Sequence, residues 1–421
     1  MATSPLDDNL YLPRLIDVRL DELLPQLPAV MMVGPRAAGK TTTISRRAAT
    51  VIRLDRPAEA AAFRADPDAA LRGLDEPVLL DEWQVAPEVL GAVRRAVEQD
   101  PRPGRFFVTG SVRAELDHKV WPATGRLVRL SMYPMSVRER LGQVKGPTFF
   151  DRIDQGGELR VPPDSPDLRG YIELALSSGF PVPALRLMGS ARLAWLESYV
   201  DDLLTHDVEQ LEDPPTRRRD PHRLHRYFEA YAINSAGVVP HNTIFNAAGL
   251  NKDTASAYES LLTDLLIAEQ IPAWVSNRLK RLVHQPKRYL IDPALVATAL
   301  RFDEDGVVRD GDVLGRVLDT FVASQLRPEL AGSSSRPRLH HLRTEQGRHE
   351  VDLVAELAVQ RIIGIEVKAS AAPMPSDAKH LTWLRDQLGA RFLAGVVFHT
   401  GPRLYSIGEK ILAAPICALW A

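Results

Sequence analysis

The chain has 421 residues, of which 45% are hydrophobic and 25% charged, with 52 Lys and Arg against 54 Asp and Glu. This length predicts about two to four domains, and the composition excludes wholesale disorder. The net charge of -2 excludes a whole-chain attraction to nucleic acid, and the single cysteine, Cys417, excludes a disulfide framework or a cysteine zinc site.

Neither end of the chain carries a targeting or membrane signal. Residues 1–10 are polar and include two Asp, with no basic stretch before an apolar core. The apolar stretch 411–421 is about half as long as a membrane helix. We therefore expect a soluble, cytoplasmic protein without a membrane partner.

The first part of the chain alternates short apolar runs with helical patterns. Four apolar runs are predicted as strands: 29–33, 51–54, 78–80 and 106–108. Helical patterns lie between them, such as residues 87–99 between the third and fourth runs. This alternation predicts a parallel α/β sheet in a domain spanning residues 1–150. Ligands of such sheets bind at the carboxyl ends of the strands, where each of these runs is followed by glycine or polar residues.

Residues 34–41 fit the phosphate-loop pattern G-x-x-x-x-G-K-[ST], between a predicted strand and a predicted helix. The glycines allow backbone N–H groups to face phosphates, and the helix N-terminus adds a partial positive charge. We expect Lys40 to contact the β- and γ-phosphates of ATP and Thr41 to bind Mg²⁺. The residues expected to bind the nucleotide are Gly34, Pro35, Arg36, Ala37, Ala38, Gly39, Lys40, Thr41 and Thr42.

Two further strand ends complete the predicted ATP site. Asp81, at the end of one run, is expected to hold Mg²⁺, and the adjacent Glu82 is expected to orient the attacking water. Ser111 follows another run, where a hydroxyl could sense the γ-phosphate or simply belong to a turn. Arg126 is a candidate for an arginine that acts on the γ-phosphate, within the chain or across a subunit contact.

A polar stretch, 142–157, and a proline-rich stretch, 161–166, predict the first domain boundary. A helical domain over residues 165–300 follows, in which helices 221–235, 243–250 and 253–269 have the order of a winged helix. The third helix carries several acids and is a poor match to DNA, whereas the predicted hairpin 278–288 is basic and could hold a nucleic-acid backbone. The alternative is a packing or protein-contact module.

An acidic, glycine-spaced stretch, 303–312, predicts a second linker, followed by a domain over residues 311–421. A helix is expected at 313–326, and strands near residues 351, 362 and 396. Asp352 precedes the E-x-K pair Glu366 and Lys368 by fourteen residues, which resembles the PD-(D/E)XK nuclease core. Glu366 and Lys368 share a strand face because side chains alternate with a period of two.

In a nuclease of this kind, Asp352 and Glu366 would bind a divalent metal ion. Asp319, on the preceding helix, would complete the acidic set, and Lys368 would stabilise the reacting phosphate or help to activate water. The alternative is a strand face with a salt bridge. An E-x-K pair alone cannot separate the two.

The chain resembles the prokaryotic AAA-type ATPases of the STAND and origin-recognition branch that carry a C-terminal domain of unknown function. The matching stretches extend over almost the whole chain, with GPRAAGKT (34–41), LDRP (54–57), VLLDEWQVAPEVL (78–90), FFVTGS (106–111), TGRLVRLSMYPMSVRE (124–139), GFP (179–181), KRLVHQPKRYLIDPALV (280–296), GRVLDTFVASQL (315–326), EVDLVAE (350–356) and IGIEVKAS (363–370). The resemblance implies an ATPase and supports the winged helix. Two positions depart from the family pattern: Asp319 stands where Glu is favoured, and Trp83 where a small aliphatic residue is usual.

Two hypotheses from different classes follow. In the first, a Mg²⁺-dependent ATP hydrolase uses its nucleotide state to control a C-terminal nuclease-like domain that acts on DNA or RNA. In the second, ATP and ADP switch a protein-interaction scaffold whose nuclease-like domain is inactive. A second copy of the chain is one of the partners to be tested. A small-molecule kinase would also use a phosphate loop, but the Asp81–Glu82 pair favours water as the nucleophile.

Overall fold

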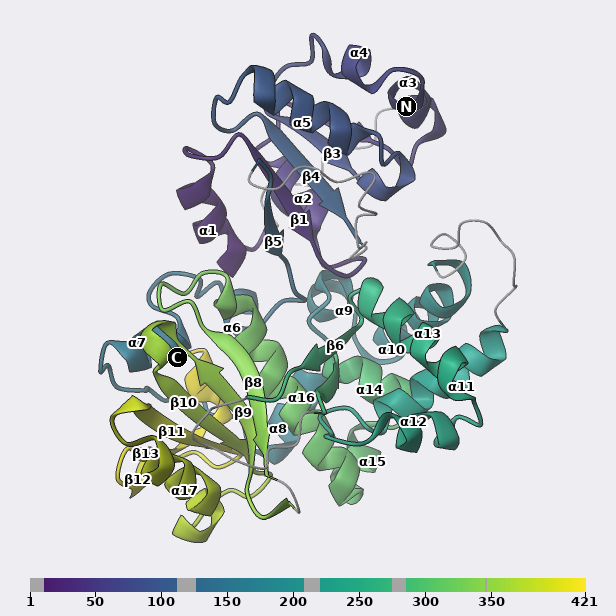
Figure 1. The fold of residues 1–421 in the computed structure, drawn as a ribbon. Coiled ribbons are helices and arrows are strands. Elements are labelled where there is room, and N and C mark those ends of the chain that lie inside the picture. The colour runs from purple at the N-terminus through teal and green to yellow at the C-terminus, as the bar shows by residue number, and fades with distance from the viewer. Residues whose placement is uncertain (1–10, 112–125, 208–219, 275–284, 345–346) are drawn as a thin grey trace. The chain divides into compact units, whose positions relative to one another are not determined.

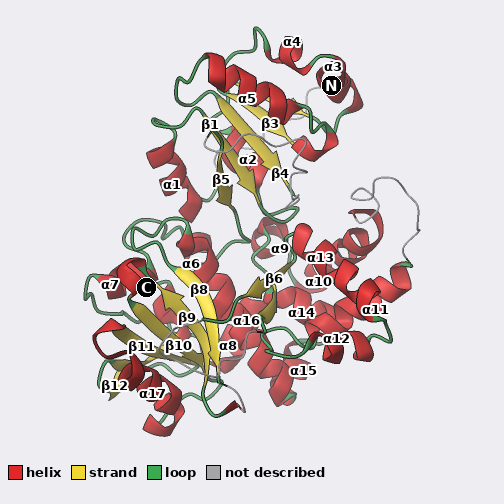
Figure 2. Ribbon diagram, in the orientation of Figure 1, coloured by secondary structure: helices red, strands yellow, loops and turns green. Residues whose placement is uncertain are grey.

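The computed structural model describes residues 11–111, 126–207, 220–274, 285–344 and 347–421. The chain divides into two compact units, Met1–Gly146 and Pro147–Ala421 (Figures 1 and 2). This division lies within the stretch 142–157, where the sequence predicts a boundary. Among the described residues, no helix combines the length and the apolar character needed to cross a bilayer.

The first unit is a parallel sheet with helices between its strands, as the sequence predicts. Its strands are β1 (Ala29–Val33), β2 (Thr50–Arg53), β3 (Val78–Asp81), β4 (Phe106–Gly110) and β5 (Val128–Ser131). Its helices are α1 (Leu15–Leu23), α2 (Lys40–Ser45), α3 (Pro57–Ala65), α4 (Pro67–Leu71), the short 3-10 helix η2 (Trp83–Val85), α5 (Val89–Gln99) and α6 (Val137–Arg140).

The strand order is β2-β3-β4-β1-β5, and every pairing is parallel. Crossovers between parallel strands are right-handed, so the connection from β1 to β2 places α2 on one face. The steps from β2 to β3 and from β3 to β4 run the other way and place α3, α4 and α5 on the opposite face (Figure 1). Strands β1, β3 and β4 are buried along their whole length. The carboxyl ends of these three strands therefore meet at one edge of the sheet.

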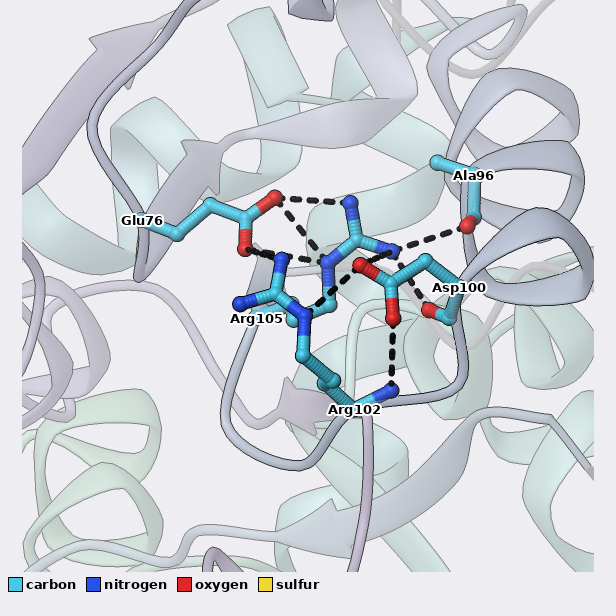
Figure 3. Close-up of polar contacts among 5 residues, drawn as sticks. All are labelled: Glu76, Ala96, Asp100, Arg102 and Arg105. Atoms are coloured by element: carbon cyan, nitrogen blue, oxygen red, sulfur yellow. Dashed lines mark hydrogen bonds and ion pairs between the residues drawn. The ribbon is translucent and has the colours of Figure 1, made fainter.

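The opposite edge of this sheet is closed by a polar network centred on Arg105 (Figure 3). Its Nε lies 3.0 Å from both carboxylate oxygens of Glu76, and its Nη1 donates to the carbonyl oxygens of Ala96 and Asp100 at 2.8 and 2.5 Å. Arg102 contacts the Asp100 carboxylate at 2.7 Å. These contacts hold the end of α5 against the starts of β3 and β4.

The second unit begins with helices and ends with a mixed sheet. Its first part contains α7 (Phe149–Asp154), α8 (Leu168–Leu176), α9 (Pro181–Arg186), α10 (Gly189–Asp202), the π-helix η3 (Leu203–Asp207), α11 (Pro221–Ala232), α12 (His241–Ala247), α13 (Lys252–Asp264), β6 (Ala268–Ile271), β7 (Lys287–Leu290), α14 (Pro293–Leu300) and α15 (Glu304–Arg309). Its second part contains α16 (Gly311–Leu330), β8 (Arg338–Arg343), β9 (Glu350–Glu356), η5 (Ala358–Gln360), β10 (Ile362–Val367), η6 (Pro375–Ala378), α17 (Lys379–Leu388), η7 (Gly389–Arg391), β11 (Phe392–His399), β12 (Tyr405–Gly408), β13 (Ile411–Pro415) and η8 (Ile416–Leu419).

Most of the stretch 303–312, which the sequence predicts as a linker, forms helix α15. The Asp303 side chain accepts the Gly306 N–H at 2.7 Å and caps the helix. Acids follow in the first turn and Arg309 lies in the last turn, as the helix dipole favours. Helix α15 packs against α8 and α16, so the residues that resemble a linker are part of the fold.

Only residues 285–288 of the predicted basic hairpin 278–288 are described, and there the structure favours packing over contact with a nucleic-acid backbone. Lys287 and Arg288 lie in β7, which pairs with β6, and both side chains are buried. Arg288 Nε contacts the Glu259 carboxylate of α13 at 2.5 Å. The other three basic residues of the stretch lie outside the described residues. Helices α11, α12 and α13 and the β6–β7 pair follow one another in the expected order, and the winged-helix assignment stays a prediction.

The C-terminal sheet has the order β12-β13-β11-β10-β9-β8. Strands β10, β11 and β13 run parallel, and the outer strands join them antiparallel. Helix α17 packs on this sheet through Leu381 and Leu384, which share a core with Ile362, Phe392 and Val397. Helix α16 also contacts β10 and is longer than the predicted helix 313–326. These contacts bring α16, β9 and β10 together.

Candidate functional site

The phosphate loop connects β1 to α2 in the first unit. Gly39 has φ 98° and Ala37 has φ 62°, so two residues of the loop adopt the left-handed conformation. A Cβ atom at Gly34 would lie 2.2 Å from the carbonyl oxygen of Met132, which permits only glycine at this close approach. Arg36, Ala37 and Thr42 are exposed along the loop and the first turn of α2, whereas Pro35 and Ala38 are buried.

Lys40 supplies a buried ammonium group inside this loop. Its Nζ donates to the carbonyl oxygens of Gly34 and Pro35, both at 3.0 Å. Burial lowers the pKa of Lys40 to about 8, although the charges of Glu82 and Asp81 act in the opposite direction. The loop thus holds a cation next to backbone groups that could face phosphates.

Thr41 and Asp81 meet across the ends of α2 and β3. The Thr41 hydroxyl donates to the two carboxylate oxygens of Asp81 at 2.8 and 3.1 Å. The Thr109 hydroxyl, at the end of β4, donates to the same carboxylate. A hydroxyl and a carboxylate are oxygen ligands of the kind that Mg²⁺ prefers together with waters and phosphate oxygens. Thr41 and Asp81 therefore fit the ion that the phosphate loop implies.

Glu82 follows Asp81 in the left-handed conformation, with φ 58° and ψ 52°. Its carboxylate lies 3.2 Å from the Ser111 hydroxyl and contacts the Gln84 side-chain amide. Non-glycine residues rarely adopt this conformation, and such residues cluster at functional sites. The backbone at Glu82 turns its side chain toward the residue that follows β4.

Three residues of this site were not predicted from the sequence. Thr109 lies in the matching stretch 106–111 and Gln84 in the stretch 78–90, and neither was given a role. Arg14 is buried; its Nη1 donates to Ala38 at 2.9 Å, and its Nε contacts Glu139 at 3.0 Å. A single arginine in the N-terminal segment carries no sequence signal for such a contact.

Arg126 does not lie near the phosphate loop of its own chain. It precedes β5, whose first paired residue, Val128, lies beside Val30 at the start of β1. The loop begins at the far end of β1, about 13 Å away along the strand. The Arg126 guanidinium contacts Glu98 of α5 at 3.1 Å. Action of Arg126 on the γ-phosphate, within the chain or across a subunit contact, stays a prediction.

The four C-terminal site residues predicted from the sequence come together where the middle of α16 meets the start of β9 and the end of β10. Extending the β9–β10 pairing by one position places Asp352 opposite Glu366, and opposed residues share a face of the sheet. Lys368 Nζ contacts Glu366 Oε2 at 3.1 Å. A fifth residue, Lys287 of β7, contacts Asp319 at 2.5 Å and Asp352 at 3.2 Å. It was interpreted from the sequence as part of a surface hairpin.

The electrostatics of this acidic cluster follow from burial. Burial raises the pKa of Asp319 to about 6 and raises the pKa of Glu366 well above its usual range. Burial alone would lower the pKa of Lys287, but the charges of Asp319 and Asp352 raise it well above the ordinary value. Lys287 is thus charged, and it is the main counter-charge of Asp319.

A divalent ion does not fit this cluster while Lys287 keeps its position. Asp319 accepts from Lys287 and from the Tyr289 hydroxyl, and Asp352 accepts from Lys287 and from the backbone N–H of Val367 at 2.9 Å. No group of three or more His, Cys, Asp or Glu side chains in the described part of the chain has the geometry of a metal site. The expectation that Asp352 and Glu366 bind a metal ion is therefore not supported by this arrangement.

Comparison with known proteins gives family matches for three stretches of the chain. Residues 26–141 match the family model of an AAA domain, residues 168–306 a domain of unknown function (DUF8612), and residues 314–419 another domain of unknown function (DUF4143). Together with the parallel sheet and its phosphate loop, the first match supports a P-loop ATPase domain of the AAA type in the first unit.

Relatives are known in mycobacteria. The uncharacterized protein Mb2031c of Mycobacterium bovis and the uncharacterized protein Rv2008c of Mycobacterium tuberculosis are each 28% identical to this chain over 410 residues, which cover 94% of this chain and 82% of theirs. Among solved structures, the Walker-type ATPase PABY2304 of Pyrococcus abyssi aligns with a TM-score of 0.42 and 16% identity, over 72% of this chain and 99% of that one.

Proposed function

We propose that this protein binds ATP with Mg²⁺ and hydrolyses it at the carboxyl ends of β1, β3 and β4. The observation that carries the proposal is the convergence of Lys40, the Thr41–Asp81 pair and Glu82 at one sheet edge. The residues come from two separate parts of the chain, the start of α2 and the end of β3, and each offers the chemistry that ATP hydrolysis needs.

The roles follow from the contacts of each side chain. Lys40 turns from the carbonyl oxygens of Gly34 and Pro35 to the β- and γ-phosphate oxygens. Thr41 and Asp81 hold Mg²⁺, which neutralises charge on the phosphates. Glu82 accepts a hydrogen bond from the attacking water and orients it, and Ser111, 3.2 Å from the Glu82 carboxylate, positions that carboxylate.

For the second unit, Lys287 favours the interaction scaffold over the nuclease. Its ammonium already contacts the carboxylates of Asp319 and Asp352, which a nuclease would need for a metal ion. We therefore propose that nucleotide state is transmitted to a module that binds a partner without cleaving it. DNA, RNA and a second copy of the chain remain candidate partners.

A surface in the second unit supports an interaction role. A cavity of about 920 Å³ lies among α10, α11, α14 and α15, with Leu193, Leu196 and Phe228 in its wall. Leu193 is half exposed, and Met188, just before α10, is 81% exposed. Exposed apolar side chains beside a cavity are typical of surfaces that bind other molecules.

The ATPase proposal is tested by ATP binding and turnover in matched variants. Lys40→Ala should lose ATP binding, because the phosphates lose their main cation. Glu82→Gln should bind ATP but turn it over at least about a hundredfold more slowly, because the water loses its base. The exposed residues Lys379 and Glu88 provide matched controls, Lys379→Ala and Glu88→Gln. Unchanged ATP affinity in Lys40→Ala would rule out this site.

The role of the second unit is tested by adding partners to the same assay. ATP turnover is measured with and without single-stranded and double-stranded DNA or RNA, and each nucleic acid is then examined for cleavage. Stimulated turnover with intact nucleic acid would support a nucleotide-switched binding module. Cleavage that is lost in Lys368→Ala would instead restore the nuclease hypothesis.

A further inference from the structure

Lys287 takes the place of a bound cation in the acidic cluster of the C-terminal sheet. A lysine ammonium has three N–H donors, and three acceptors surround this one. They are Asp319 Oδ2 at 2.5 Å, Asp352 Oδ1 at 3.2 Å and the carbonyl oxygen of Asp352 at 3.2 Å. Two carboxylate oxygens and one carbonyl oxygen around a single positive charge form an oxygen set that a divalent ion would also accept.

The side chain is held in this position by the fold. Lys287 is 1% exposed, and lysine is almost never buried to this degree unless it is paired. It is the first residue of β7, whose pairing with β6 places it beside α16 and β9. The Tyr289 hydroxyl, from the same face of β7, donates to the other Asp319 oxygen at 2.8 Å. Strand β7 thus supplies both partners of Asp319.

Glu366 gives a second, independent sign of an ion-binding site. It is 3% exposed, and its Oε1 is buried without a hydrogen-bond partner. Extending the β9–β10 pairing by one position places Glu366 opposite Asp352, so it borders the same cluster. A buried carboxylate oxygen without a partner is costly, and a nearby cation is one way to satisfy it.

We propose that Lys287 is a built-in counter-ion that occupies the place a divalent metal ion would take among the oxygens of Asp319 and Asp352. In the wild-type protein the ammonium and the metal ion exclude each other. Removal of the ammonium leaves the acidic oxygens for Mg²⁺ or Mn²⁺. This inference concerns the second unit alone and does not depend on ATP hydrolysis by the first.

The experiment compares Mn²⁺ binding by the full-length wild type, Lys287→Ala and Lys287→Met, without nucleotide. Free and bound Mn²⁺ are distinguished by electron paramagnetic resonance, and thermal unfolding is followed in parallel. We expect that Asp352→Asn does not change Mn²⁺ binding by the wild type. We expect the Lys287 variants to lose about 10 °C in Tm, because two buried carboxylates lose their partner, and to regain Tm in Mn²⁺.

Two controls tie the result to this cluster. Asp352→Asn, introduced into Lys287→Ala, should abolish the added Mn²⁺ site, because it removes one of the oxygen ligands. Lys379→Ala removes an exposed lysine of α17 and should behave as the wild type does. Mn²⁺ binding that appears in Lys287→Ala and is lost in the double variant would support the proposal.

Two results would overturn the proposal. One is a folded Lys287 variant that binds no more Mn²⁺ than the wild type. The other is Mn²⁺ binding by the wild type itself that Asp352→Asn removes, since the ammonium would then not exclude the ion. If both Lys287 variants fail to fold, the wild-type measurement still decides: Asp352-dependent binding contradicts the proposal, and its absence supports it.

Discussion

The guanidinium of Arg14 donates to the carbonyl oxygen of Ala38, inside the phosphate loop, at 2.9 Å. The same side chain donates to the carbonyl oxygen of Tyr133 at 2.7 Å and to the buried carboxylate of Glu139 at 3.0 Å. One residue before α1 therefore connects the phosphate loop to the segment between β5 and α6. The N-terminal segment therefore contacts the phosphate loop even though it contains no motif.

Arg14→Lys should weaken ATP binding by about tenfold without unfolding the first unit. A lysine keeps the charge beside Glu139, but its single ammonium cannot reach three acceptors in three directions. ATP affinity and Tm are measured for this variant and for Arg105→Lys, which changes the network at the opposite edge of the sheet. Equal ATP affinities in the two variants would show that Arg14 does not position the loop.

ATP binding should weaken as the pH rises above about 8, by up to tenfold per pH unit. Burial lowers the pKa of Lys40 to about 8, so the free protein loses this charge above that pH, whereas bound phosphates favour the charged form. Binding should then take up a proton, which calorimetry in buffers of different ionisation enthalpy detects. An affinity that is constant between about pH 7 and pH 9 would contradict this role for Lys40.

The lowered pKa of Lys40 also makes the stability of the first unit depend on pH. The unfolded chain keeps the Lys40 proton up to the ordinary lysine pKa, so it binds more protons than the folded protein from about pH 8 upward. This group therefore makes the first unit more stable as the pH rises through that range. Lys40→Met should remove that part of the pH dependence in urea unfolding.

Gly34→Ala should destabilise the first unit by about 1–3 kcal/mol. The added Cβ would lie 2.2 Å from the carbonyl oxygen of Met132. This oxygen belongs to the backbone, which cannot shift away from the Cβ as a flexible side chain could. Gly315→Ala, in helix α16, is the control, since a Cβ there meets nothing within 4 Å. It should be neutral or stabilise its unit by up to about 1 kcal/mol. Urea unfolding that gives the same change for both would contradict the close approach.

Arg126→Ala should leave ATP turnover within about twofold of the wild type if the arginine acts only through Glu98. The guanidinium contacts Glu98 near the end of α5, and a catalytic role across a subunit contact needs a separate test. Sedimentation in ATP and in ADP tests that role. Greater self-association in ATP, together with a large loss of turnover in Arg126→Ala, would show that it acts in a second chain.

The sequence alone predicted the parallel sheet of the first unit and the residues at the core of its candidate ATP site. The strand β1 has the predicted bounds, and Lys40, Thr41, Asp81 and Glu82 meet at the predicted sheet edge. This was possible because the pattern is local: apolar runs specify buried parallel strands, and residues just after such runs share one edge. The glycine spacing of the loop is local as well.

The tertiary structure alone decided the contacts between distant segments. Arg14 reaches Ala38, and Lys287 reaches Asp319 and Asp352, across separations that no periodicity records. Lys287 belongs to a basic stretch for which the sequence left open a hairpin that holds a nucleic-acid backbone or a packing module, and β7 carries it into the protein, where burial makes pairing with carboxylates obligatory. A charged residue is exposed or buried according to what packs on it, and that depends on the whole fold.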